Sequence, residues 1–221
     1  MEICGIICEY NPLHLGHKKQ IDTIRAMTGP DSGIVCLMSG NFVQRGVPAI
    51  VDKMCRAKAA VLCGADLVLE LPTAYSCASA ERFAFGGVRL AELTGITDTL
   101  SFGCETKDIA LLSSLADLFT DEPASFQNDL KYFLESGCSF AAARAKAAEK
   151  QIRGAEAILS QSNAILAIEY LKAIRKLSSS LLPCPILRAG TSSEQSDETG
   201  DKYASARAIR NAISCGDPLP E

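Results

Sequence analysis

Short apolar runs and helix-like stretches alternate along most of this sequence, and this alternation restricts the fold more than any other feature. Apolar runs of strand length occupy residues 3–8, 34–39, 67–71, 99–102 and 185–188. The first four are separated by helical stretches at 16–27, 52–63 and 80–93. Strands joined by such helices need right-handed crossovers. The sequence therefore predicts an α/β fold with a parallel sheet.

The pattern changes after the fourth strand. Helical stretches then follow one another with no strand between them, at 108–119, 124–135, 140–152 and 163–176. We expect three parts: an α/β core over 1–107, a helical insertion over 108–180, and a return to the core over 181–221 with the last strand and a helix near 205–214. Residues 191–202 (TSSEQSDETGDK) are polar, and we expect a mobile loop there.

Composition restricts where such a chain can act. No apolar run reaches the roughly 18 residues that a membrane span needs, and the start MEICGIICEY lacks the basic region of an export signal. We therefore expect a cytoplasmic protein with no membrane partner. The ten cysteines form no C-x-x-C pair and lie mostly in apolar runs, which predicts reduced thiols in a core. With 22 basic and 26 acidic residues, the net charge of −4 argues against a uniformly basic nucleic-acid binder but leaves room for a local basic patch.

Both histidines lie in one tetrapeptide, His14-Leu15-Gly16-His17, between the first strand and the first helix. In parallel sheets, ligands bind beyond the carboxyl ends of strands, and the next helix N-terminus attracts phosphate. Gly16 lets the backbone approach a phosphate or base closely. We predict that His14 and His17 donate hydrogen bonds to oxygens that gain charge in phosphoryl transfer. Two simpler interpretations stay open: helix capping alone, or a metal pair, which would need ligands beyond the two histidines.

A second polar segment, 40–46, follows the second strand at the same sheet edge. Its backbone amides, an amide side chain and a guanidinium could hold a small anion or a phosphate. We predict that role, for acetate or phosphate, at Gly40, Asn41, Gln44 and Arg45. The alternative is an ordinary surface loop that contains one arginine.

Charged residues follow this loop. Asp52 is expected to cap the helix at 52–63. Lys53 and Arg56 could face phosphate or RNA, although a solvated helix face is the more common place for such charges. Glu70 lies within the apolar run LVLEL, and the pattern predicts that it is buried, where it orients a site group or pairs with a cation.

Several long motifs carry a resemblance to known enzymes. The strand, H-x-G-H turn and helix resemble the nucleotidylyltransferase superfamily that includes class I aminoacyl-tRNA synthetases. The string GIICEYNPLHLGH resembles the tRNA(Met) cytidine acetate ligase family in particular, and further similar stretches lie at 38–72, 79–87, 101–105, 162–173 and 204–210. The resemblance implies a Rossmann-like fold of the HIGH type with a helical insertion. It also implies ATP-dependent activation of acetate to acetyl-adenylate, with Mg²⁺, and acetylation of N4 of the wobble cytidine of elongator tRNA(Met).

The resemblance implies which residues act. His14 and His17 would be catalytic. The implied ATP site comprises Ile7, Cys8, Glu9, Tyr10, Asn11, Pro12, Leu13, His14, Leu15, Gly16, His17, Lys18, Lys19, Gln20, Gly103, Asn163, Arg188, Ser205 and Arg210. On residue chemistry alone, Gly103 could be a simple turn and Asn163 a helix N-cap, whereas Arg188 at a strand end has its own case for phosphate. No resident metal site is predicted.

The sequence also departs from the family. The motif I-S-S-T-x-x-R corresponds here to residues 204–210, where Ala206 and Arg207 replace Ser and Thr, so hydroxyl donation rests on Ser205. Family members continue well beyond the last helix, whereas this sequence stops at Glu221, and the part it lacks would help to bind tRNA. The basic candidates near the site, Lys18, Lys19, Arg45, Lys53 and Arg56, cover few phosphates, so we expect weak tRNA binding. Two other functions stay open: a small-molecule nucleotidylyltransferase, or a non-catalytic adaptor that binds ATP or RNA.

Overall fold

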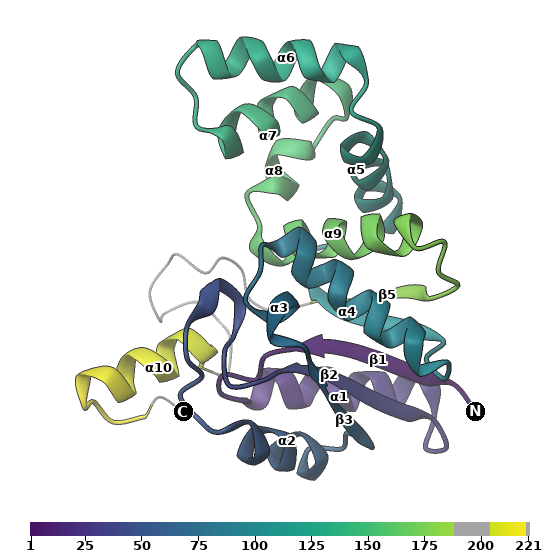
Figure 1. Ribbon diagram of the computed structural model, residues 1–221, viewed down its shortest axis with the longest axis vertical. Coiled ribbons are helices and arrows are strands. Elements are labelled where there is room, and N and C mark those ends of the chain that lie inside the picture. Colours follow the sequence, from purple (N-terminus) through teal and green to yellow (C-terminus); the bar gives the residue numbers. More distant parts are fainter. Residues whose placement is uncertain (188–203, 220–221) are drawn as a thin grey trace.

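The computed structural model describes residues 1–187 and 204–219, and it contains a five-stranded sheet in the order β3-β2-β1-β4-β5 (Figure 1). Every neighbouring pair of strands is parallel. The strands are β1 (Ile3–Cys8), β2 (Gly33–Ser39), β3 (Leu67–Leu71), β4 (Thr99–Cys104) and β5 (Leu182–Leu187). The predicted parallel α/β fold is confirmed.

The last strand begins earlier than its apolar run suggests, at Leu182 rather than at 185. Pro183 and Pro185 lie opposite Leu100 and Phe102 of β4. Because β5 is an edge strand and the N–H of Leu182 is bonded toward β4, the two prolines fall at alternate positions whose nitrogens face away from the sheet. Proline is tolerated in a strand only where its nitrogen is not needed for a ladder hydrogen bond.

Helices cover both faces of the sheet. On one face, β1 and β2 pack against α1 (Leu15–Thr28) and α2 (Lys53–Leu62) through a core that includes Ile21, Ile34 and Ala60. The other face packs against α4 (Ala80–Thr94) and α9 (Ser162–Lys176). The remaining helical elements are η1 (Gln44–Gly46), α3 (Thr73–Ser76), α5 (Ile109–Asp121), α6 (Ala124–Glu135), α7 (Phe140–Gln151), α8 (Ala155–Leu159) and α10 (Ala206–Cys215).

One glycine brings α4 close to the central strand. A Cβ on Gly87 would overlap the side chain of Ile7 in β1, so only glycine permits this approach. The same helix contributes Phe83, which is buried near the carboxyl ends of the strands. The close packing therefore helps to shape the edge of the sheet where the site lies.

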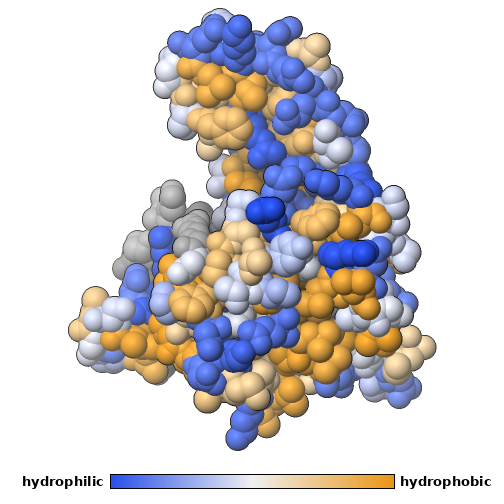
Figure 2. All heavy atoms as spheres, viewed as in Figure 1, coloured by the Kyte–Doolittle hydropathy of each residue, from blue (hydrophilic) through white to orange (hydrophobic). Residues whose placement is uncertain are grey.

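The helices between β4 and β5 extend away from the sheet. Figure 1 shows α6 and α7 farthest from it, with α5 leading out to them and α8 leading back to α9. Because α9 packs on both α4 and α5, it belongs as much to the layer that covers the sheet as to the insertion. On the face in Figure 2, hydrophilic residues cover the outer side of the insertion, and more apolar residues appear over the α/β part. The three-part division at 107 and 180 stays a prediction.

Three further expectations have a structural outcome. Glu70 is exposed rather than buried, because β3 is the edge strand of the sheet. All ten cysteines are free thiols. Among the described residues, no helix is long and apolar enough to cross a membrane. The polar segment predicted at 191–202 lies outside the residues that the structure describes.

Candidate active site

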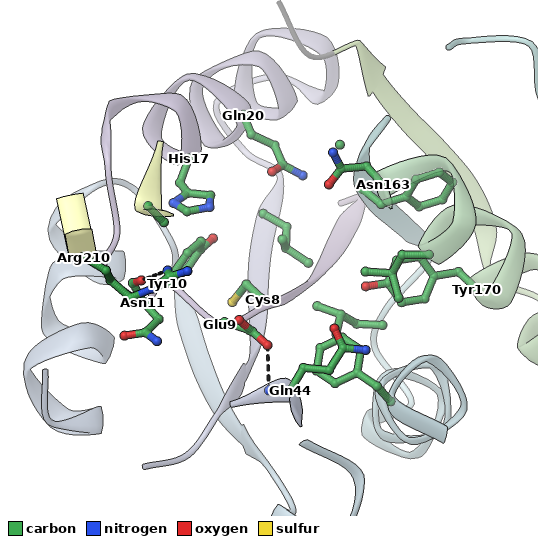
Figure 3. Close-up of a pocket in the computed structure, with 17 residues that line it drawn as sticks. Cys8, Glu9, Tyr10, Asn11, His17, Gln20, Gln44, Asn163, Tyr170 and Arg210 are labelled. Carbon is green, nitrogen blue, oxygen red and sulfur yellow. Dashed lines mark hydrogen bonds between the residues drawn. The ribbon is translucent and has the colours of Figure 1, made fainter. Parts of the chain in front are cut away.

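A cavity opens where the order of the sheet reverses. The chain runs outward from β1 through β2 to β3, and then returns to place β4 and β5 on the other side of β1. The carboxyl ends of β1 and β4 therefore flank a crevice, which is where α/β sheets of this kind bind ligands. The residues that line the cavity (Figure 3) are Ile6, Ile7, Cys8, Glu9, Tyr10, Asn11, His17, Gln20, Gln44, Phe83, Phe102, Gly103, Asn163, Leu166, Tyr170, Ala206 and Arg210.

The two histidines form the start of α1. His14 is the N-cap, and its Nδ1 accepts a hydrogen bond from the N–H of Gly16 at 3.0 Å. In return, the His14 N–H donates to Nδ1 of His17 at 3.3 Å, which completes a capping box. The ring centroids lie 3.8 Å apart. Both histidines therefore cap α1, and whether they also act on a ligand is a separate question.

This capping also fixes the chemistry of the rings. A neutral imidazole whose Nδ1 accepts a hydrogen bond carries its proton on Nε2. In the neutral form, each of the two histidines therefore carries an Nε2–H that can donate a hydrogen bond. His17 lines the cavity, with Tyr10 edge-on at 5.0 Å between ring centroids, whereas His14 does not line it. The turn therefore presents one donor to the cavity and supports it with the second ring.

The structure gives a reason for glycine at position 16 that was not predicted. A Cβ at this position would lie 2.8 Å from Cε1 of His14. The space beside the backbone is thus filled by the His14 ring, and the Gly16 N–H is bonded to that ring. Glycine therefore makes room for the histidine cap, and its role in the approach of a phosphate stays a prediction.

Residues from the far end of the chain reach the same cavity. Arg210 of α10 donates from Nη1 to the carbonyl of Asn11 at 2.6 Å, across 199 positions of sequence. Ser205 caps α10, where its Oγ accepts from the N–H of Ala208 at 3.2 Å. The guanidinium of Arg210 therefore lies beside the H-x-G-H turn, at the end of the cavity suited to phosphate.

Arg56 is buried, not solvated as the sequence suggested. Its side chain is 1% exposed and donates only to backbone carbonyls, those of Val51, Glu9 and Ser39 at 3.0, 2.5 and 3.1 Å, and that of Gly40. Burial lowers the pKa of this guanidinium, and nearby acidic groups oppose the shift. Arg56 thus binds the carboxyl ends of β1 and β2 together, and it cannot reach RNA.

The predicted anion loop divides into two parts. Gln44 lines the cavity, and its N–H donates to Oε1 of Glu9 at 2.8 Å. Asn41 does not line it, because its Oδ1 accepts from the N–H of Lys53 at 3.2 Å. Gly40 is packed beside Glu70, with no space for a side chain between them. Of Gly40, Asn41 and Gln44, whose side chains or backbone the structure describes, Gln44 is the one that lines the cavity.

Next to this loop, the charged residues are engaged with one another. Asp52 caps α2 as predicted, by accepting from the N–H of Met54 at 2.8 Å. Lys53 pairs with Glu70 at 2.7 Å, so the expected cation partner of Glu70 is found. This pair is partly exposed to solvent, where an ion pair contributes little to stability.

The apolar wall of the cavity was not expected from the sequence. Phe83 of α4, Phe102 of β4 and Leu166 and Tyr170 of α9 form it, with ring centroids of Phe102 and Tyr170 5.6 Å apart. Burial raises the pKa of Tyr170 well above its ordinary value, and burial likewise raises the pKa of the Cys8 thiol. Both groups are therefore neutral, and Cys8 is not a thiolate nucleophile.

No resident metal site is apparent in the part of the chain that is described, where no three histidine, cysteine, aspartate or glutamate side chains gather to hold an ion. The two histidines accept hydrogen bonds at Nδ1, so neither offers that nitrogen to a metal.

Comparison with known proteins decides the family. Residues 1–219 match the family described as HIGH Nucleotidyl Transferase. The chain belongs to the HIGH nucleotidyl transferase family. The superfamily predicted from the H-x-G-H turn is therefore confirmed, with the fold that it implied.

Relatives of this nucleotidyl transferase include tRNA(Met) cytidine acetate ligases. That of Clostridium novyi is 45% identical over 216 residues, and that of Thermoanaerobacter sp. 46% over 215 residues. Each alignment covers 96% of this chain, but 54% and 53% of the relative, so the chain spans about half the length of the curated relatives it matches. The predicted resemblance to these ligases is confirmed.

Solved structures agree. Apo Thermotoga maritima TmcAL superposes with a TM-score of 0.87 at 36% identity, covering 100% of this chain and 55% of that one. The same protein bound with alpha-thio ATP gives a TM-score of 0.83 at 35% identity, covering 97% and 50%.

In this nucleotidyl transferase, many of the residues predicted for ATP converge on one cavity. They are Ile7, Cys8, Glu9, Tyr10, Asn11, His17, Gln20, Gly103, Asn163 and Arg210. Others lie outside the lining: Pro12, Leu13, His14, Leu15, Gly16, Lys18, Lys19 and Ser205. Arg188 and the side chain of Arg45 lie outside what the structure describes. Asn163 is not the N-cap of α9, which is Gln161; it is the second residue of the helix.

Proposed function

We propose that this chain is the adenylate-forming part of a tRNA(Met) cytidine acetate ligase. In that role it binds ATP and acetate, forms acetyl-adenylate, and passes the acetyl group to N4 of the wobble cytidine of elongator tRNA(Met). The observation that carries the proposal is that His17 and Arg210 both line the cavity where the order of the sheet reverses. Similarity to these ligases over 96% of the chain, and to an ATP-analogue complex of TmcAL, supports the choice of reaction.

In the first step, an acetate oxygen attacks the α-phosphorus of ATP. The new O–P bond forms as the bond between the α-phosphorus and the bridging oxygen breaks, and pyrophosphate leaves. His17 donates its Nε2–H to an α-phosphate oxygen, where charge grows. Arg210 balances charge on the leaving phosphates. The apolar wall keeps water away from the α-phosphorus, because water would otherwise compete with acetate as the nucleophile.

In the second step, N4 of cytidine attacks the carbonyl carbon of acetyl-adenylate. A C–N bond forms, AMP leaves with the bridging oxygen, and N4 loses a proton. The mixed anhydride is already activated, so the step needs no nucleophile from the protein. This agrees with the neutral thiol of Cys8 at the cavity.

Mg²⁺ fits this site only as an ion that binds together with the nucleotide. Because the described part of the chain gathers no ligand set of its own, phosphate oxygens would supply most of the coordination. When bound, the ion would neutralise phosphate charge. The steps above are assigned to residues of the chain alone.

Binding of tRNA by this chain should be weak. Of the basic residues near the site, Lys18 pairs with Asp22 at 2.6 Å, Lys53 pairs with Glu70, and Arg56 is buried. Among the side chains that the structure describes near the site, few cations then remain to neutralise RNA phosphates, so we expect a shallow dependence of affinity on salt. We propose a cytoplasmic location, where its tRNA substrate is found.

Exchange of labelled pyrophosphate into ATP tests the proposed function. The chain should exchange only when acetate is present, and His17→Ala should slow the exchange about a hundredfold to a thousandfold. Lys131→Ala, on the insertion far from the cavity, serves as the control and should leave it unchanged. Exchange that needs a phosphorylated metabolite instead of acetate would point to a small-molecule nucleotidylyltransferase. ATP binding with no exchange under any acid would point to an adaptor.

A further inference from the structure

A buried tyrosine points its hydroxyl into the cavity. Tyr170 of α9 is 3% exposed and lines the cavity. Figure 3 shows its hydroxyl directed inward, toward the side where Cys8 and Glu9 lie. Within the described part of the chain, no group forms a hydrogen bond with this hydroxyl. Because buried polar groups nearly always have a partner, a ligand in the cavity is expected to provide it.

This hydroxyl is a hydrogen-bond donor. Burial raises the pKa of Tyr170 well above its ordinary value, and the nearby Cys8 and Glu9 add to the shift, so the phenol keeps its proton. Glu9 does not accept this donor; one of its oxygens accepts from the N–H of Gln44 at 2.8 Å instead. An ionised carboxylate offers only acceptors, so the carboxylate of a ligand matches the hydroxyl.

The surroundings of the hydroxyl suit the rest of a small acid. The ring of Phe102 lies 5.6 Å from that of Tyr170 between centroids, and Phe83 and Leu166 complete the apolar wall. This wall carries no charge, so it fits a methyl group and not a phosphate. The phosphate end of the cavity lies elsewhere, because Figure 3 shows Arg210 and Tyr170 on opposite sides.

This separation agrees with the geometry of phosphoryl transfer, in which the attacking and leaving oxygens lie roughly in line through phosphorus. With the leaving phosphates at Arg210, the acid approaches from the side of Tyr170. We propose that the Tyr170 hydroxyl binds the acid substrate, by donating to the carboxylate oxygen that does not attack phosphorus, while the apolar wall receives the methyl group. The inference rests on the proposed function, because it requires an acid in this cavity.

Tyr170→Phe tests the inference, since it removes the hydroxyl and keeps the ring. Exchange of labelled pyrophosphate into ATP, measured over a range of substrate concentrations, gives the KM for acetate and the KM for ATP. The KM for acetate should rise about tenfold or more, because the lost hydrogen bond is one to a charged group. The KM for ATP and the rate at saturating acetate should stay within about twofold of wild type, because the bond contributes to binding of the acid alone.

Tyr132→Phe is the matched control. Tyr132 lies on α6, is 62% exposed and does not line the cavity, so both KM values should equal those of wild type. Thermal melts separate binding of the acid from folding. Since the Tyr170 hydroxyl has no partner among the described residues, Tyr170→Phe should melt at the same temperature as wild type or higher.

The outcomes separate the inference from the proposed function. If wild type exchanges with acetate and Tyr170→Phe has an unchanged KM for acetate, the inference is overturned and the proposed function stands. The same conclusion follows if the KM for ATP rises as much as that for acetate, which would place the hydroxyl on the nucleotide, or if the Tm of Tyr170→Phe falls. An absence of acetate-dependent exchange in wild type would refute both.

Discussion

The two histidines of the H-x-G-H turn should respond differently to substitution, because only one of them faces the cavity. His14 caps α1 through its Nδ1, and His17 lines the site and is held by a longer bond of 3.3 Å. His14→Ala should therefore lose mainly stability, and His17→Ala mainly adenylate formation.

The structure gives the expected size of each effect. Loss of an N-cap costs about 1 kcal/mol, which lowers the Tm of a chain of this size by roughly 2–4 °C. His17→Ala removes a weaker bond, so its Tm should stay nearly unchanged. Loss of one donor to a charged transition state should slow acetate-dependent pyrophosphate exchange about a hundredfold to a thousandfold.

Asparagine at position 14 separates capping from catalysis. Its side-chain oxygen caps helices as well as any residue, so His14→Asn should restore the Tm lost in His14→Ala. Any exchange still missing in His14→Asn then measures the contribution of the His14 ring itself. The measurements are thermal melts and exchange rates on the same preparations. Full exchange activity in His17→Ala, or a His14→Asn protein that melts as low as His14→Ala, would refute this division of roles.

Three further predictions concern stability and reactivity. Arg56→Met leaves several buried carbonyls without donors and should lower the free energy of unfolding by about 3 kcal/mol or more. Denaturation in urea measures this loss, and a loss below about 0.5 kcal/mol would contradict the described role of the side chain. For Asp66, burial pushes the pKa up, but hydrogen bonds from Arg25 and a backbone N–H outweigh it and lower the pKa. The ionised form then stabilises the fold above the ordinary aspartate pKa of about 3.9, and this is lost as the pH falls through the lowered value; the Tm difference between wild type and Asp66→Asn should shrink from pH 7 toward about pH 2–3, and a constant difference would disprove the assignment. With a thiol reagent and no reductant, denatured protein should titrate all ten cysteines, and native protein should react first at the exposed Cys55 and Cys215; a shortfall after denaturation would reveal disulfides.

The sequence predicted what depends on local pattern. The predicted alternation of strands and helices along the chain is found in the structure. Asp52 is the N-cap of α2, as its residue type suggests. The H-x-G-H turn predicted the location of the cavity, because a parallel sheet places such a turn at the carboxyl ends of its strands.

The burial of individual side chains depends on tertiary contacts, which the local sequence does not reveal. Nothing local distinguishes a buried Arg56 from a solvated one, because its acceptors come from three other segments of the chain. Glu70 was expected to be buried because its strand is apolar, but an edge strand leaves such a side chain in solvent. Cys104 gives another example: its place beside a loop in the sequence favours an exposed and reactive thiol, but the structure buries it, and burial raises its pKa.

The most direct test of the central claim follows the oxygen atoms of acetate. The 221-residue chain would be given ATP, acetate labelled with oxygen-18, and hydroxylamine as an acyl acceptor that replaces tRNA. If an acetate oxygen attacks the α-phosphorus within this cavity, mass spectrometry should find one labelled oxygen in the phosphate group of AMP for each acetyl group transferred. His17→Ala should form both labelled AMP and acetyl hydroxamate about a hundredfold to a thousandfold more slowly. Label in inorganic phosphate, or AMP formed without label, would show that the chain does not join acetate to the adenylate.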